Sequence, residues 1–196
     1  MIINDVKVYD GLLIHDRFAY KYFRKNTLPI GNIVAFRAPM NVQADGMIDS
    51  EDILQNDFIY SDDAINFCWE IPNLDAFGAV AYQRLFNTQI ANILSNKFLK
   101  KPIEVDGDDL MVHDPFKGND GTEQKTGKCS VSITYTKNNV ALGHTGINIT
   151  AGRRAPAFAY STNLTDPQVD QFMRDVVNVF YSINDDIFIA TTKVIS

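Results

Sequence analysis

The residues best suited to chemistry lie in two neighbouring stretches near the middle of the chain. Lys128 opens a segment that alternates polar and apolar residues, and the next such segment contains Gly143 to Asn148, which reads Gly-His-Thr-Gly-Ile-Asn. Glycines let a backbone approach a ligand closely, and a lysine beside exposed amides can hold a carboxylate or a phosphate. The pattern predicts an anion-binding pocket with Lys128 as its cation and Gly143 to Asn148 as its floor. The alternative interpretation is that Lys128 is an exposed lysine at the start of a strand.

Arg37 is the candidate for a second cation. It follows the apolar run Ile33-Val34-Ala35-Phe36 and precedes Ala38-Pro39, which places it near the end of an expected strand. An arginine at such a position can contact an anion bidentately. A surface salt bridge is the equally open alternative.

Other polar groups give weaker signals. The histidines His15, His113 and His144 lack any catalytic signature, and a metal cage built from His113 with nearby aspartates has only spacing in its favour, so no metal site is predicted. Acidic residues are dense between positions 49 and 63, where they are interpreted as complements to helix dipoles in preference to a catalytic cluster. The residues concerned are Asp114, Asp108 and Asp109 for the cage, and Asp49, Glu51, Asp52, Asp57, Asp62 and Asp63 for the acidic segment.

Composition narrows the class of protein. The chain has 196 residues, which predicts a single domain over 1–196, and 45% of them are hydrophobic, as in an ordinary globular protein. The formal net charge of -6 and the scattered basic residues argue against nucleic-acid binding. No signal peptide and no apolar run of about 20 residues is apparent, so we expect a cytoplasmic protein with no membrane partner.

These residues must be positioned by a sheet with flanking helices. Helices are predicted at 15–24, 73–99 and 166–180, a long polar loop at 113–127, and short capped elements beginning near Asp49 or Ser50 and near Ser61 or Asp62. The mixed order of elements and the hairpin at 137–139 predict an α+β fold with a mixed, largely antiparallel sheet. The predicted strands are 2–9, 31–38, 103–105, 108–112, 128–136, 140–150 and 186–195.

The central stretch resembles the core of biotin and lipoate protein ligases. The matching motifs are Asp-Asp-Leu-Met-Val at 108–112, Gly-Lys-x-Ser-Val-Ser-Ile at 127–133 and Leu-Gly-His-x-Gly-Ile-Asn-Ile at 142–149. The resemblance implies the fold of the ligase catalytic domain, with Lys128 contacting an acyl carboxylate and an adenylate phosphate. It also implies ligand-binding roles for Asp109, Gly146 and Asn148. Nearly the whole chain also resembles a small family of unknown function. Tyr9-Asp10-Gly11 is one of the motifs that carry this resemblance.

The resemblance has a departure over the nucleotide phosphates. Those ligases carry a glycine- and arginine-rich loop there, whereas Phe36 to Val42 retains only Arg37 and has no glycine. Without glycines the backbone cannot easily wrap phosphates. The resemblance as a whole implies a small carboxylic acid or acyl compound as the ligand, handled by a ligase- or acyltransferase-like enzyme. ATP and Mg²⁺ are implied by resemblance alone, and the residues themselves leave the cofactor unknown.

A noncatalytic binding or self-assembly protein remains the alternative function. Such a protein would have kept the fold and lost the phosphate loop. An exposed edge strand makes a homo-oligomer possible.

Overall fold

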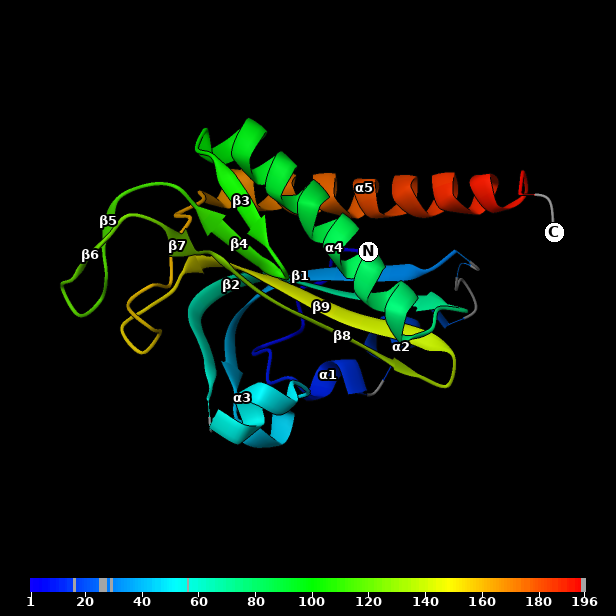
Figure 1. Cartoon of the computed structure of the whole chain (residues 1–196), viewed down its shortest axis with the longest axis horizontal. Helices are drawn as coiled ribbons and strands as arrows, with labels where there is room; N and C mark the ends of the chain where they lie inside the picture. The colour runs from blue at the N-terminus through cyan, green and yellow to red at the C-terminus, as the bar shows by residue number, and fades with distance from the viewer. Residues whose placement is uncertain (16, 25–27, 29, 56, 195–196) are drawn as a thin grey trace.

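The computed structural model describes residues 1–15, 17–24, 28, 30–55 and 57–194. At its centre is a four-stranded antiparallel sheet in the order β1-β2-β9-β8, with helices on both faces (Figure 1). The α+β class and the antiparallel sheet are therefore confirmed. The strands of this sheet are β1 (Asn32–Val42), β2 (Ile59–Pro72), β8 (Ser130–Lys137) and β9 (Val140–Thr150).

Two smaller sheets extend from one end of the central sheet. The first has the order β3-β4-β7 and the second is the hairpin β5-β6 (Figure 1). The hairpin occupies the segment that the sequence predicted as a loop. The strands are β3 (Ile103–Asp106), β4 (Asp109–Val112), β5 (Phe116–Lys117), β6 (Glu123–Gln124) and β7 (Gly127–Lys128).

One face of the central sheet is covered by α4 (Ala76–Ile93) and α5 (Asp166–Thr191). Asp75 caps α4 by accepting a hydrogen bond of 2.7 Å from the Gly78 amide, and Thr165 and Gln168 form a capping box at the start of α5. The π-helical turn η3 (Leu94–Leu99) continues α4. The large buried side chains of this core include Phe67, Trp69, Phe86, Phe172 and Phe180.

The opposite face carries a second core beneath shorter elements. The N-terminal segment runs beside β1, where the Tyr9 amide donates to the Pro39 carbonyl at 2.9 Å. Phe36 and Met40 of β1 are fully buried in this core. The elements covering it are α1 (Leu12–His15), α2 (Phe18–Phe23), the 3₁₀ turn η2 (Ala44–Gly46) and α3 (Ser50–Gln55).

Three sequence-based element predictions need correction. Residues 59–72 form one long strand instead of a short capped element, because β2 is central and buried on both faces, so its apolar run is nearly continuous. The segment 186–191 continues α5 instead of forming a strand, since extending an existing helix costs far less than starting a new element. Residues 2–9 make only isolated parallel bridges to β1. Residue 16 of the expected first helix and residue 195 of the expected last strand lie outside the described residues.

Candidate functional site

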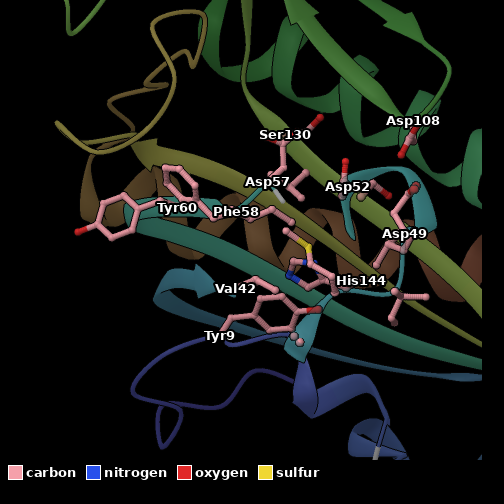
Figure 2. Close-up of a pocket in the computed structure, with 18 of the residues that line it drawn as sticks. Tyr9, Val42, Asp49, Asp52, Asp57, Phe58, Tyr60, Asp108, Ser130 and His144 are labelled. Carbon is pink, nitrogen blue, oxygen red and sulfur yellow. The ribbon is translucent and has the colours of Figure 1, made fainter. Parts of the chain in front are cut away.

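A cavity of about 640 Å³ lies on the face of the sheet that carries the second core. Strand alternation directs Val131 and Ile133 of β8 and His144 of β9 toward it, so its floor combines two aliphatic side chains with an imidazole. Phe58, Met47 and Ile14 contribute further apolar lining. Figure 2 shows Asp49, Asp52 and Asp108 on one side of this cavity and the Tyr9 and His144 rings on another.

Lys128 stands at one end of the cavity and is held by a carboxylate. Its Nζ lies 2.7 Å from the Asp109 Oδ1, and both side chains are about one-third exposed. The main chain at Lys128 is fixed on two sides, by pairing with Met111 of β4 and by hydrogen bonds to Phe158 and Tyr160. Among the described lining residues, Lys128 is the only lysine or arginine.

Asn148 belongs to the same end of the cavity. Its amide donates to the Cys129 carbonyl at 2.9 Å, so its main chain is one residue removed from Lys128. The residue is 4% exposed, and among the described residues its side-chain carbonyl oxygen has no hydrogen-bond partner. The structure thus brings together three predicted site residues: Lys128, Asp109 and Asn148.

Tyr9 and His144 form a stacked pair in the lining. Their ring centroids are 3.6 Å apart with an interplanar angle of 10°, and the His144 Nε2 lies 2.9 Å from the Asn66 Oδ1. Burial lowers the pKa of His144 to about 3, so the imidazole is neutral. Burial raises the pKa of Tyr9 well above its ordinary value. The pair is therefore an uncharged polar element in the cavity wall.

Five aspartates line the cavity: Asp49, Asp52, Asp57, Asp108 and Asp109. Burial, followed by the charges of Asp49 and Asp57, raises the pKa of Asp52, while the charge of Lys128 opposes the shift. The sequence interpretation of the segment 49–63 as complements to helix dipoles missed the role of three of these residues in the lining. The density of carboxylates in that segment was the available signal. The side chain of Glu51 lies outside the described part of the structure.

The structure does not bring Arg37 to Lys128. Arg37 donates to Asp63 at 2.6 Å and to Asp166, the first residue of α5, at 2.7 Å. These hydrogen bonds raise the pKa of the guanidinium. Arg37 shares strand parity with Ile33 and Ala35, whose side chains enter the core beneath α4 and α5, so it lies on the face opposite the cavity. The surface salt bridge is the correct alternative.

The two glycines of β9 also serve packing instead of lining the cavity. A Cβ at Gly143 would lie 2.1 Å from the Trp69 ring, so the absence of a side chain makes room for the indole. A Cβ at Gly146 would lie 2.5 Å from the Met40 sulfur. Gly146 therefore supports the cavity wall from beneath, while Gly143 faces the other core.

The metal cage considered from spacing is not assembled. His113 lies 3.0 Å from Glu104, Asp114 lies 2.9 Å from Lys101, and Asp108 lies 3.5 Å from Arg84. Across the described residues, no three histidine, cysteine or carboxylate side chains converge as metal ligands would.

The insertion at 113–127 stays away from the Lys128 cavity. Phe116 packs against Tyr160 with ring centroids 5.3 Å apart, and the hairpin borders a separate cavity of about 560 Å³. None of its described residues lines the larger cavity. The insertion therefore does not contribute to the wall of this cavity.

Solved structures with the same fold fall into two groups. A protein of unknown function from Pyrococcus horikoshi is 23% identical and superposes with a TM-score of 0.83, the match covering 100% of this chain and 97% of that one. LipL1 of P. falciparum in complex with lipoate is 16% identical with a TM-score of 0.56, covering 93% of this chain and 60% of that one. The biotin protein ligase of Aquifex aeolicus in complex with biotin and ATP is 11% identical with a TM-score of 0.54, covering 94% and 70%.

These likenesses establish the ligase catalytic-domain fold and leave activity open, because all identities are low. A comparison with curated proteins returned no match. Within the described residues, no helix combines the length and apolarity needed to cross a membrane. The family model described as a domain of unknown function (DUF366) matches residues 1–195, and the chain therefore belongs to the DUF366 family.

Proposed function

We propose that this protein binds a small carboxylic acid, or the acyl group derived from one, in the cavity that Lys128 borders. The observation that carries the proposal is that Lys128 lines the same cavity as the aliphatic side chains of Val131 and Ile133 and is the only lysine or arginine among the described lining residues. The ammonium group of Lys128 donates to the carboxylate or acyl oxygen, and the hydrocarbon part lies on Val131 and Ile133. A volume of about 640 Å³ is within the range of small-molecule sites. The lipoate- and biotin-bound structures of the same fold support this ligand class.

Isothermal titration with octanoate, lipoate and biotin tests the proposal. Replacing Lys128→Met removes the charge at similar length, and we expect affinity to fall roughly 10-fold or more, since hydrogen bonds to charged groups contribute about 1.5–3 kcal/mol. The matched control is Lys125→Met, an exposed lysine outside the lining, which is expected to bind as the parent does. The proposal would be refuted if none of the three acids bound, or if Lys128→Met bound them with the same affinity as the parent protein.

Two observations favour binding without adenylation. β1 runs as a strand from Asn32 to Val42, through the segment that the sequence resemblance matches to the phosphate loop of the ligases. Arg37 is already engaged with Asp63 and Asp166. We therefore expect no release of pyrophosphate when ATP, Mg²⁺ and an acid that binds are supplied together. Measurable release would instead favour a ligase-like enzyme.

Self-assembly is the second candidate function, and the end of α5 supports it. Ile187, Phe188 and Ile189 are exposed on the last turns of this helix, which extends past the sheet (Figure 1). Exposed apolar side chains gathered in one place favour association. Sedimentation velocity over a range of concentrations would show a larger species for the full chain than for a chain ending at Asp185. Identical monomer behaviour of both chains would exclude association through this helix end.

A further inference from the structure

The charge of the Lys128 cavity does not match a simple carboxylate ligand. Five aspartates line it against one lysine, and that lysine already pairs with Asp109 at 2.7 Å. Arg84, which lies 3.5 Å from Asp108, is outside the lining. A ligand that brought only negative charge would be repelled by the carboxylates of Asp52 and Asp57. The cavity therefore favours a ligand that also carries positive charge.

The mutual proximity of the aspartates supports the same reading. Asp52 of α3 interacts electrostatically with Asp49, Asp57 and Asp108, and also with Lys128. Figure 2 shows Asp49, Asp52 and Asp108 on the same side of the cavity. Asp52 thus lies close to both Asp108 and Lys128, so a cationic group of a ligand that bound Asp52 would lie near a carboxylate that bound Lys128.

Asn148 supplies an independent sign of a ligand with N–H donors. Its side chain is on the same face of β9 as His144, it is 4% exposed, and its carbonyl oxygen lacks a partner among the described residues. A buried acceptor without a donor is costly, and native structures rarely keep one without a reason. The oxygen is enclosed in the cavity wall, so a donor on a ligand would satisfy it once the Asn148 amide turned toward the cavity.

The arrangement of the carboxylates fits an organic cation better than a bare metal ion. Across the described residues, no three metal-ligating side chains converge on one point. An alkylammonium group has three N–H donors that can reach separate acceptors, as spread carboxylates and an amide oxygen require. Acceptors of this kind are present at Asp52, Asp57 and Asn148.

We infer that the ligand of this cavity carries an ammonium group beside its carboxylate, as an aliphatic amino acid does. Lys128 contacts the carboxylate, the aspartates with Asn148 accept the N–H groups, and the aliphatic chain covers Val131 and Ile133. The inference rests on the proposed function, because it assumes the carboxylate contact with Lys128.

A matched set of three probes separates the two claims. Calorimetric titration is carried out on the full chain with octanoate, octylamine and 2-aminooctanoate, which share the alkyl chain and differ only in the head group. We expect 2-aminooctanoate to bind at least 10-fold more tightly than octanoate. Equal affinity of the two acids overturns the inference and leaves the proposed function standing. Binding of octylamine alone overturns both claims, as does silence from all three probes.

Variants test which residues produce the expected preference for 2-aminooctanoate over octanoate. Asp52→Asn removes one charge from a half-buried side chain without changing its size, and we expect it to reduce the preference for 2-aminooctanoate to less than about 3-fold. Asn148→Leu removes the acceptor at similar volume and is expected to weaken 2-aminooctanoate more than octanoate. Asp170→Asn, on the exposed face of α5, is the charge-matched control and is expected to retain the full preference.

Two further results would count against the inference. If Asp52→Asn and Asp170→Asn keep the same preference, the acidic end of the cavity does not recognise the ammonium group. If octanoate binds only when Mg²⁺ is added and 2-aminooctanoate gains nothing, the carboxylates serve a metal ion instead. The Asp52→Asn measurement remains decisive even if Asn148→Leu does not fold.

Discussion

Gly143 shows how a residue of apparent functional interest can be fixed by packing. Its position in β9 leaves a notch that the Trp69 ring fills, with the nearest ring atom 2.1 Å from where a Cβ would be. Trp69 is buried, and its ring also packs against Tyr82 and Phe86. The glycine is therefore required by the core between the sheet and its helices.

We predict that Gly143→Ala destabilises the protein by roughly 1–3 kcal/mol, the range for overpacking a well-filled core. Neither neighbour can move easily, because β9 is central in the sheet and the indole is enclosed. Thermal or urea unfolding measures the change. Gly78→Ala in the first turn of α4 is the control, where alanine favours the helix and no neighbour is nearer than 3.1 Å. Equal stability of the two variants would contradict the packing role.

At the scale of elements, α5 divides into a packed part and an exposed part. Phe180 is fully buried, and the Asn184 Nδ2 donates to the Tyr82 hydroxyl at 2.9 Å. From residue 185 to residue 194 every side chain is exposed. The last turns therefore owe their helical state to propagation from the packed part.

We predict that a chain ending after Asp185 keeps the unfolding midpoint of the full chain within a few degrees, because no buried contact is lost. A chain ending after Val179 loses the Phe180 ring, and deletion of a buried phenylalanine costs about 3–5 kcal/mol. Thermal unfolding followed by circular dichroism compares the three chains. A large loss in the Asp185 chain would mean that the exposed turns contribute to stability after all.

The strand predicted most accurately from the sequence was β9, whose start is marked by the hairpin turn at 137–139 and whose bounds of 140–150 are confirmed. The strand predicted at 128–136 overlaps β8, which runs from Ser130 to Lys137, whereas Lys128 belongs to the short strand β7. The β2 strand was missed because burial on both faces removes the alternation that identifies a strand. The end of α5 was missed because exposed β-branched and aromatic residues favour strand by propensity alone.

The candidate site could be predicted only in part for a related reason. Lys128, Asp109 and Asn148 come from adjoining strands, so local pairing brings them together and motif spacing could find them. The partners of Arg37 depend on which face of β1 packs against α5. This packing is a tertiary contact that the local sequence around Arg37 does not encode. The same holds for the approach of α3, which carries Asp52 to the cavity.

At the scale of the whole molecule, the sheet separates two cores, and the core that contains His144 makes stability depend on pH. Burial lowers the pKa of His144 to about 3, below the value of 6.5 for an unburied imidazole. Between these values the unfolded chain binds a proton that the folded chain does not. Above pH 6.5 this group therefore does not change the free energy of unfolding. As the pH falls below 6.5, protonation of the unfolded chain lowers the free energy of unfolding.

We predict that the free energy of unfolding decreases between pH 6.5 and pH 4.5 by up to about 1.4 kcal/mol per pH unit from this one residue. The raised pKa of Asp52 acts in the opposite direction as the pH falls, because protonation removes a charge that burial, and then the charges of Asp49 and Asp57, disfavour in the folded state. Urea unfolding at several pH values measures the slope. His144→Gln is expected to flatten it. An unaltered slope in His144→Gln would assign the effect to other groups.

The packing of Trp69 against Gly143 also determines what the intrinsic tryptophan fluorescence of this protein can measure. The chain has a single tryptophan, and the structure encloses its indole among aromatic rings on the side of β9 away from His144. We expect a blue-shifted fluorescence spectrum that moves to longer wavelength on denaturation and stays constant when the Lys128 cavity is filled. The indole is thus an optical probe of folding, and occupancy of the cavity must be followed by another signal.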